Sequence, residues 1–219
     1  MPLVHTPWIG RRRLVLGISA AAASLLVPGL KFTQAALIAS PRQTEGPFYP
    51  DDWDGDADND LVVVAGEAAR AMGQVTHVEG RVLDILGAPV PETEVEIWQC
   101  DAQGVYRHPR DERGGRGRDP GFQGRGRTIA DAAGKYRFRT IRPVPYNGRT
   151  AHIHFKVQPP GGSALITQMY VFGEERNAVD GVLNSIRDER QRDSVIVRLD
   201  PADRLEPGAL AAVFDIVIG

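Results

Sequence analysis

The chain has 219 residues, of which 42% are hydrophobic and 25% are charged, an ordinary composition for a soluble globular protein. Its formal net charge of −2 gives no bulk reason to expect nucleic acid or an anionic membrane as a partner. The single cysteine excludes an internal disulfide framework, and 24 glycines with 16 prolines favour short strands and turns over long helices.

Residues 1–36 are interpreted as an export signal of the twin-arginine kind. Arginines at 11–13 precede an apolar run at 14–30, and small residues at 35–36 fit a cleavage site, although Gly10 stands where Ser or Thr is usual. We therefore expect a mature protein in the periplasm or outside the cell. The alternative is an uncleaved membrane anchor, for which the apolar run is short.

Residues 37–71 are expected to form an extended arm that leads into the domain. The stretch 41–60 is rich in proline, glycine and aspartate and shows no helix or strand period. An EF-hand loop starting at Asp54 would need glycine and glutamate where Asn59 and Ala65 stand, so the pattern for calcium fails. A solvated acidic loop is the better interpretation.

Residues 72–219 are predicted to form an all-β catalytic domain, an antiparallel β-sandwich with long loops and one short helix. Apolar and polar residues alternate over short segments separated by turn residues, which is typical of such folds. The segments are 76–85, 93–101, 135–141, 151–157, 164–172, 194–200 and 211–219, and only 179–193 has a helical pattern.

The stretch 106–127 is rich in arginine and lies between two of these strands. Such a segment in isolation can bind RNA. Here acidic residues partly balance its charge, so a long ordered loop beside a site is the better interpretation.

Two histidines one residue apart carry the first chemical signal. His152 and His154 lie in the predicted strand 151–157, where residues two apart project from one face. Two imidazoles side by side on a rigid sheet form half of a metal site. Taken alone, the pair fits two surface histidines equally well.

Two tyrosines favour the metal interpretation. Tyr106 and Tyr146 each follow a turn, and Tyr146 lies six residues before His152. No carboxylate or cysteine has a comparable relation to the histidines, as a zinc hydrolase or an Fe(II) facial triad would need. A tyrosinate oxygen is a hard, anionic ligand that favours a trivalent ion such as Fe(III). Each tyrosine taken singly also fits a core or turn position.

With these residues in place, the sequence resembles the intradiol ring-cleavage dioxygenases, in particular the protocatechuate 3,4-dioxygenase type. The matching segments run in order from TEGPFYP (44–50) to TQMY (167–170). Specific spacings join Trp98 and Gln99 to Tyr106, and Arg149 to the histidine strand.

The resemblance implies a non-haem Fe(III) held by Tyr106, Tyr146, His152 and His154. It implies that a catechol displaces Tyr146 and gives it a proton, and that Lewis-acid activation then opens the ring to O2. Cleavage between the two hydroxyl-bearing carbons would yield a cis,cis-muconate-type diacid. Arg149 would stabilise developing negative charge, and Gln168 would orient the substrate through hydrogen bonds.

The sequence departs from the family in one place that bears on specificity. Only Asn147 and Gly148 separate Tyr146 from Arg149, where relatives have a longer segment with substrate contacts. We therefore expect a wider pocket and a catechol other than protocatechuate. The expected partners are a catechol-type substrate and O2, no nucleic acid, and either a second copy or a related chain.

Two other functions fit parts of the pattern. A non-catalytic β-sandwich module that binds aromatics or glycans would have the same frame, because a fold does not fix a function. A zinc hydrolase would use the histidine pair but lacks a third ligand at a known spacing. The complete set of two tyrosines, two histidines and Arg149 favours the enzyme.

Overall fold

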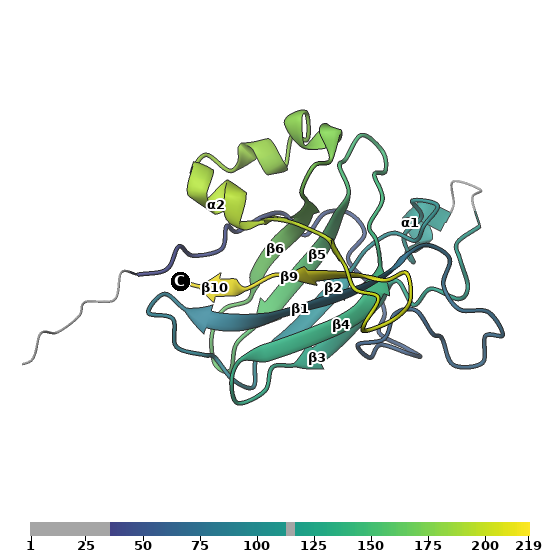
Figure 1. Cartoon of the computed structure of the whole chain (residues 1–219), viewed down its shortest axis with the longest axis horizontal. Helices are drawn as coiled ribbons and strands as arrows, with labels where there is room; N and C mark the ends of the chain where they lie inside the picture. Colours follow the sequence, from purple (N-terminus) through teal and green to yellow (C-terminus); the bar gives the residue numbers. More distant parts are fainter. Residues whose placement is uncertain (1–35, 113–116) are drawn as a thin grey trace, which may run out of the picture. The chain divides into compact units, whose positions relative to one another are not determined.

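The structure is a computed structural model that describes residues 36–112 and 117–219 (Figure 1). The stretch expected to be an export signal lies, except for its last residue, outside the described residues. In the described part of the chain no helix is long and apolar enough to cross a membrane.

The elements follow in chain order. The strands are β1 (Val75–Asp84), β2 (Glu94–Trp98), β3 (Arg125–Ile129), β4 (Lys135–Ile141), β5 (His152–Gln158), β6 (Leu165–Val171), β7 (Ile196–Val197), β8 (Asp200–Pro201), β9 (Leu210–Val213) and β10 (Ile216–Ile218). The helical elements are α1 (Pro109–Glu112), the 3-10 turns η1 (Glu175–Ala178) and η2 (Leu183–Ser185), and α2 (Glu189–Ser194). Within the described residues the strands form two sheets, one of order β10-β1-β9-β8 with β4 on β1, the other β3-β2-β5-β6-β7.

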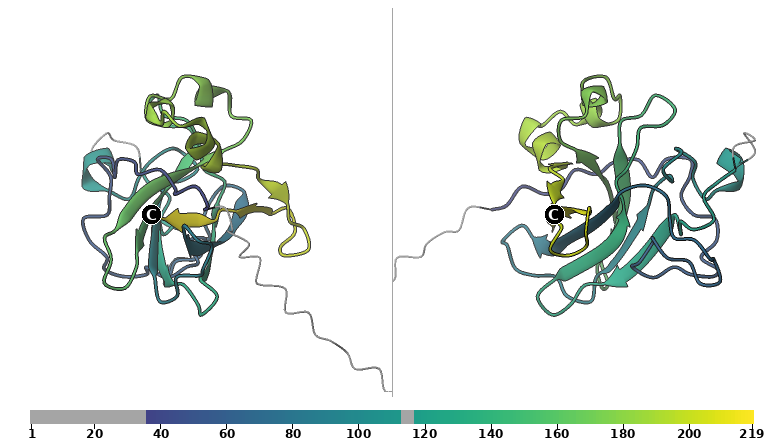
Figure 2. Two further views of the ribbon diagram at one scale, coloured as in Figure 1. Left: turned by 90° about the vertical axis from the view of Figure 1, so that its left-hand side faces the viewer. Right: turned by 45° about the vertical axis from the view of Figure 1, so that its right-hand side comes forward.

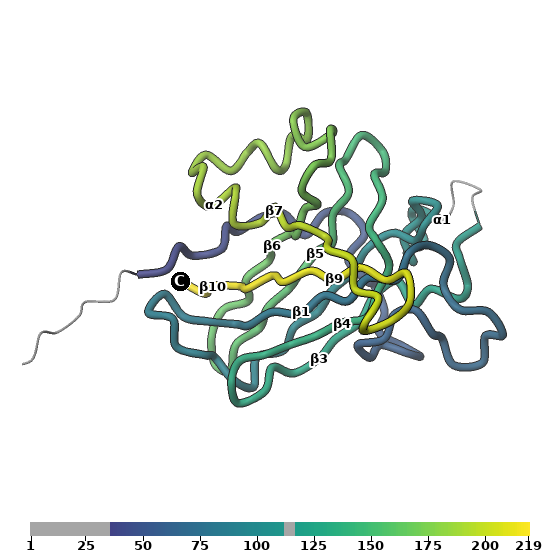
Figure 3. Tube along the Cα trace, viewed as in Figure 1, coloured from purple at the N-terminus to yellow at the C-terminus, as the bar shows by residue number. Residues whose placement is uncertain are grey.

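The expected mostly β fold with little helix is confirmed, but the sheets are mixed, so the prediction of an antiparallel sandwich is wrong in this respect. β1 pairs in parallel with β9 and β10, and β6 pairs in parallel with β7, which Figure 3 shows beside it. A parallel neighbour needs a long connection, because a tight hairpin reverses the chain. The segment from β6 to β7 is such a connection, and alternation alone does not reveal pairing direction.

The predicted helix over 179–193 is wrong in extent. Only α2 forms there as an α-helix, and it begins after Asp188, whose side chain caps it by accepting from Gln191 N at 3.1 Å. Upstream, the side chain of Asp180 binds backbone amides two and three residues ahead of it. Such local hydrogen bonds hold a turn in place of a continuous helix.

The predicted loop 106–127 ends in a strand that the pattern did not reveal. β3 carries Arg125 and Arg127 in place of apolar residues, so it lacks the usual alternation. Arg125 is nevertheless buried, and its Nη2 donates to Asp52 of the arm at 2.6 Å. The pairing of β3 with β2 is therefore stabilised by contacts distant in sequence.

The core between the sheets fixes which way β5 faces. Ile153 and Phe155 of β5 pack in one cluster with Val78 of β1 and Phe138 of β4, and each is at most 2% exposed. Burial of each such side chain stabilises the fold by about 1.5–3 kcal/mol. Because neighbouring residues of a strand point to opposite faces, the alternate residues of β5 point outward from this core.

The arm, residues 37–71, covers that outer face. It has no helix and, apart from an isolated bridge at Asp60, no strand, and Figures 1 and 2 show its first part in purple crossing β6. Gln43 N donates to the carbonyl of Ile166 in β6 at 2.8 Å. Further along, Leu61 is fully buried and donates from its backbone to Arg139 of β4. The first part of the arm thus covers the outer face of the second sheet, while Leu61 lies in the core beside β4.

Candidate active site

Two imidazoles face each other on the outer face of β5. The Nε2 atoms of His152 and His154 lie 3.1 Å apart, and both rings are at most 2% exposed. His152 Nδ1 lies 2.6 Å from the carbonyl oxygen of Thr150, so its proton sits on Nδ1 and its Nε2 lone pair is available to a cation. Burial, together with nearby Arg149, lowers the pKa of His152 to about 4, and burial lowers the pKa of His154 well below its usual value. Both rings are therefore neutral at neutral pH, as metal ligands must be.

Tyr106 lies beside the histidines with its hydroxyl unpaired. Its ring centroid is 6.0 Å from that of His154, and its backbone N–H donates to Asp111 Oδ2 at 2.8 Å. The buried hydroxyl oxygen makes no hydrogen bond of normal geometry among the described residues, although the Tyr146 side chain is close enough to affect its pKa. Such a group is costly to leave unsatisfied, so the position calls for a cation or another partner. Burial raises the pKa of Tyr106 well above its usual value, so a tyrosinate forms there only beside a positive charge.

Tyr146 lies on the other side of the same space. Its ring centroid is 4.9 Å from that of Tyr106 and 5.5 Å from that of His152. Burial raises the pKa of Tyr146, but Tyr106 and the positive charge of Arg149 oppose the rise. Tyr146 is therefore the easier of the two tyrosines to ionise.

The short segment after Tyr146 is a tight turn. Asn147 and Gly148 have φ of 41° and 80°, and Arg149 N–H donates to the Tyr146 carbonyl at 2.7 Å. Positive φ at both central positions is the geometry of a type I′ turn, for which Asn-Gly is a preferred pair. The turn thus places Tyr146 and Arg149 directly opposite each other.

Three side chains hold the Arg149 guanidinium. Its Nε donates to Asp180 Oδ2 at 2.7 Å, while Nη2 donates to Gln168 Oε1 at 2.7 Å and to the Tyr170 hydroxyl at 3.4 Å. Gln168 is itself fixed, because its Nε2 donates to the carbonyl of Thr44 at 3.0 Å. These hydrogen bonds hold the charged guanidinium of Arg149 in a single position beside the tyrosine and histidine rings.

The arm supplies the cover of the site, which the sequence pattern did not reveal. Phe48 stacks on Tyr106 with ring centroids 5.0 Å apart and 25° between the planes. Gly46 has φ of 77°, and a Cβ there would stand 3.4 Å from His154 Cε1. Both residues belong to the segment TEGPFYP, whose glycine and aromatic residues are the signal that could have indicated a role in the site.

Trp98 frames the histidine pair, whereas His108 has a different place. Trp98 of β2 stacks on His154 with centroids 4.7 Å apart and 11° between the planes, which fixes the plane of that ring. His108 lies apart from the pair, because its Nδ1 accepts from Arg110 N at 3.1 Å and its ring meets the edge of Phe48. It anchors the start of α1.

The structure brings the candidate residues from the sequence together in one place. They are Tyr106, Tyr146, Arg149, His152, His154 and Gln168. Among the described residues no group of three or more His, Cys, Asp or Glu side chains is placed to hold a metal ion. The tyrosines, whose rings lie beside the histidine pair, are potential oxygen ligands for a metal ion there.

Comparison with known proteins shows the family to which the chain belongs. A family model described as a dioxygenase matches residues 44–219. The protocatechuate 3,4-dioxygenase beta chain of Burkholderia cepacia is 38% identical over 185 residues, which cover 81% of this chain and 78% of that protein. The hydroxyquinol 1,2-dioxygenase of Rhodococcus opacus is 35% identical over 164 residues, which cover 64% of this chain and 50% of that protein. The chain thus spans about half the length of the hydroxyquinol relative.

Solved structures give the same result. The dioxygenase domain of a dioxygenase and carbohydrate-binding protein fusion from Streptomyces sp. SirexAA-E is 29% identical, with a TM-score of 0.63, over 83% of this chain and 98% of that one. Catechol 1,2-dioxygenase from Acinetobacter sp. ADP1 is 26% identical, with a TM-score of 0.60, over 82% of this chain and 62% of that one. Fold and site therefore define an oxidoreductase of the dioxygenase class. Within it, the chain belongs to the intradiol ring-cleavage dioxygenase family.

Proposed function

We propose that the protein is a non-haem Fe(III) dioxygenase that cleaves a catechol-type ring with O2, between the two hydroxyl-bearing carbons, to a cis,cis-muconate-type diacid. The cluster of two neutral imidazoles and two buried tyrosines, one of them with an unpaired hydroxyl, carries the proposal. Membership of the family supports the class of reaction.

The donor set fits ferric iron. Phenolate oxygens are hard and anionic, and imidazole nitrogens suit iron as well as zinc and copper. The residues that would hold the ion are Tyr106, Tyr146, His152 and His154. When bound, ferric iron supplies a Lewis acid that withdraws electron density from a coordinated catechol.

The two tyrosines have different roles in this proposal. Tyr106 is fixed by the stacked ring of Phe48 and by the bond from its amide to Asp111, so it stays in place. Tyr146 is separated from Arg149 by a two-residue turn and is easier to ionise. Its phenolate is placed to accept a proton from an incoming catechol hydroxyl and to move aside as the substrate enters.

Arg149 acts on the substrate by its charge, and Gln168 acts through Arg149. A guanidinium held in one position stabilises negative charge that develops on the ring without having to reorganise. The amide of Gln168 orients that guanidinium through its Oε1. The arm, with Phe48 over Tyr106, shields this region from water.

The substrate is proposed to be a catechol that needs no carboxylate contact between Tyr146 and Arg149. The only side chain between them belongs to Asn147, which is exposed. We infer a wider pocket at this point than a longer segment would leave. A screen of catechol, hydroxyquinol and protocatechuate tests this, with a strong preference for protocatechuate as the contradicting result.

Export and assembly are also proposed. The arginines and apolar run of residues 1–36 favour export to the periplasm or beyond, where the enzyme would act on external aromatics. Replacing Arg11, Arg12 and Arg13 with lysine should keep the full-length protein in the cytoplasm, as fractionation would reveal. Pairing with a second copy or a related chain is proposed because one relative is a beta chain. Light scattering of the purified protein gives its mass in solution and so tests pairing with a second copy.

The decisive experiment is the visible absorption spectrum of residues 37–219, purified in air with iron supplied. A tyrosinate on ferric iron absorbs visible light by charge transfer, so the protein should be red-brown, and anaerobic catechol should shift the band. A protein that stays colourless after iron reconstitution would overturn the proposal and favour a binding module. Formation of a muconate from catechol under air would establish the reaction.

A further inference from the structure

Asp180 is a fully buried carboxylate for which the sequence pattern gave no role. It lies between η1 and η2, is 0% exposed, and accepts four hydrogen bonds. Oδ2 accepts from Arg149 Nε at 2.7 Å and from Thr150 N at 2.9 Å. Oδ1 accepts from the backbone N–H of Val182 at 3.0 Å and of Leu183 at 2.9 Å. Its own turn holds one oxygen, and the other is directed at the site.

The contact with Thr150 extends from Asp180 to a histidine. The Thr150 N–H donates to Asp180, while the carbonyl of the same residue lies 2.6 Å from His152 Nδ1. The Thr150 hydroxyl donates to Asn177 Oδ1 at 2.7 Å, which ties it to the same segment. The backbone that sets the His152 tautomer is therefore held by the carboxylate that holds Arg149.

A buried ion pair contributes little to the free energy of folding compared with apolar residues of the same size. The cost of removing two charges from water often equals their attraction, and apolar residues of similar volume are frequently as stabilising. Burial opposes ionisation of Asp180, yet the bonds from Arg149 and from the amides of Leu183 and Thr150 hold its pKa below the usual value. Asp180 therefore remains charged, and its hydrogen bonds to Arg149 and Thr150 connect that charge to the site.

We propose that Asp180 is a positioning residue of the active site, which fixes the guanidinium of Arg149 and, through Thr150, the ring of His152. The inference rests on the proposed function for its effect on turnover. Its effect on Arg149 and His152 is independent of iron and of the reaction.

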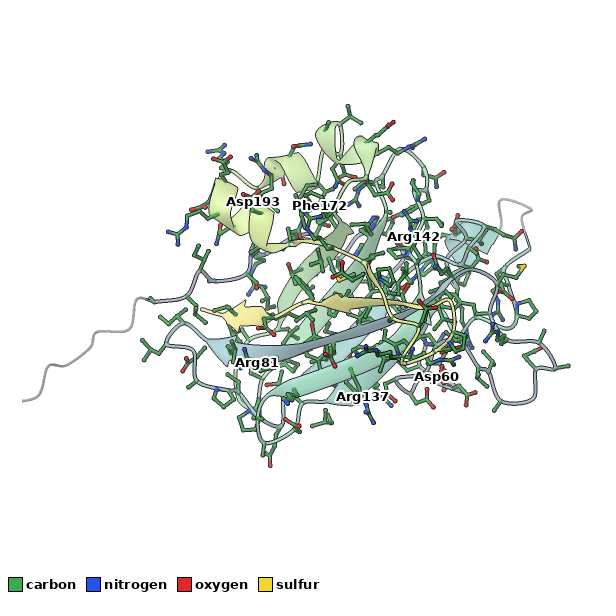
Figure 4. All side chains as sticks on the ribbon, in the orientation of Figure 1. Asp60, Arg81, Arg137, Arg142, Phe172 and Asp193 are labelled. Atoms are coloured by element: carbon green, nitrogen blue, oxygen red, sulfur yellow. The ribbon has the colours of Figure 1, made fainter. Side chains whose placement is uncertain are left out.

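The test is Asp180→Asn, with Glu174→Gln as the matched control. Glu174 also pairs with an arginine, since its Oε1 accepts from Arg142 Nη2 at 2.9 Å, and Arg142 (labelled in Figure 4) is not part of the site. Both changes remove one negative charge and one ion pair. With catechol and iron-loaded protein, Asp180→Asn should lower kcat about 100-fold and change KM less than about threefold, because misplacement of a catalytic group acts on the chemical step. Glu174→Gln should stay within about twofold of wild type.

A double-mutant cycle separates positioning from general destabilisation. If Asp180 acts through both Arg149 and Thr150, Asp180→Asn should lower kcat by no more than about tenfold in an Arg149→Met background, because only the route to His152 remains there. It should also raise the melting temperature there, because the single Arg149→Met variant leaves the carboxylate buried without its partner. A full additional loss of kcat in that background, or wild-type kcat in the single Asp180→Asn variant, overturns the proposal.

Nuclear magnetic resonance of the iron-free wild-type protein tests the same proposal without a variant. The Arg149 Nε–H should exchange with solvent at least about tenfold more slowly than that of Arg142, which is half exposed, because a buried hydrogen bond protects it. The nitrogen shifts of His152 should report the tautomer with the proton on Nδ1. Equal exchange rates, or the opposite tautomer, overturn the proposal even if Asp180→Asn does not fold. Absence of colour in the iron-loaded wild type would instead count against the proposed function alone.

Discussion

At the scale of single residues, the site is explained by what burial does to four titratable rings. Burial keeps His152 and His154 neutral, which suits them as ligands, but it also keeps Tyr106 and Tyr146 protonated unless a positive charge is near. Arg149 is held close enough to favour ionisation of Tyr146. The same burial therefore means that either tyrosine ionises only beside a positive charge, such as the proposed metal ion, and that Tyr146 ionises more readily than Tyr106.

Replacing Tyr146 with phenylalanine tests this asymmetry. The ring should continue to pack against Tyr106 and His152, so the fold should be retained, but the visible band should shift or weaken. Loss of a general base should lower kcat by about 10²-fold or more. The matched control is Tyr136→Phe in β4, whose hydroxyl bonds to Phe214 in the core and whose loss should affect stability without affecting colour. An unchanged band and unchanged kcat in Tyr146→Phe would contradict the ligand assignment.

At the scale of elements, two connections that lack regular structure place the chemistry. The arm sets Gly46 beside His154 and Phe48 over Tyr106. The Asn147-Gly148 turn sets Tyr146 opposite Arg149. β5 provides a rigid base because its other face is locked into the core. The turn is short and closed by a hydrogen bond, so its backbone geometry sets the distance between the side chains of Tyr146 and Arg149.

A Gly148→Ala substitution measures how much the turn matters. A Cβ at Gly148 would meet no atom within 4 Å, so the cost is that of a left-handed backbone alone, about 1–2 kcal/mol. If the turn relaxes to avoid this cost, Tyr146 and Arg149 separate and kcat should fall about tenfold. Gly208→Ala is the control, because Gly208 has φ of 75° and equally open surroundings but lies in the segment before β9. It should lose similar stability and keep wild-type kcat, and equal kcat in both variants would contradict a role for the turn.

At the scale of the whole molecule, the sequence predicted what is local and missed what depends on distant contacts. Alternation predicted β5 and β6 to within about a residue, since one face of each packs in the core. β3 was missed because Arg125 replaces the apolar residue expected there and is buried through its contacts with Asp52 and the arm. The parallel pairs and the cover formed by the arm were missed for the same reason, because no local period encodes them.

For the candidate site, the sequence selected residues that lie together in the structure but missed those that hold them in place. Spacing and resemblance selected the tyrosines, the histidines, Arg149 and Gln168, all of which the structure brings together. The sequence did not predict the residues whose hydrogen bonds hold these site side chains in place. Asp180 and Gln43 come from segments without regular secondary structure, and their roles depend on side-chain hydrogen bonds to Arg149 and Tyr170.

An ion-pair cluster on the first sheet joins three segments that are far apart in sequence, and it makes stability depend on pH. Arg139 of β4 pairs with Asp60 of the arm at 3.0 Å and with Glu206, ahead of β9, at 2.8 Å, on the side of the molecule where Figure 4 labels Asp60. The hydrogen bond from Arg139 lowers the pKa of Glu206 from its ordinary value of 4.5 to about 2. A carboxylate with a depressed folded-state pKa contributes stability above its unfolded pKa, and that contribution is lost as pH falls through the folded value.

Glu206→Gln should therefore lower the free energy of unfolding by about 1 kcal/mol at pH 7, a small effect because Glu206 is 21% exposed and solvent screens the pair. Urea unfolding at pH 7, 4.5 and 3 should show the difference from wild type shrinking between about pH 4.5 and 2, where the wild-type carboxylate takes up its proton. Acid titration of His152 affects both proteins alike, whereas His77, whose Nε2 lies 3.4 Å from Glu206 Oε2, belongs to the same ion-pair cluster. Asp193→Asn, an exposed change in α2 (labelled in Figure 4), should cost nothing at any of these pH values. A difference for Glu206→Gln that stays constant from pH 7 to 3 would mean that packing of the side chain, and not its charge, joins the three segments.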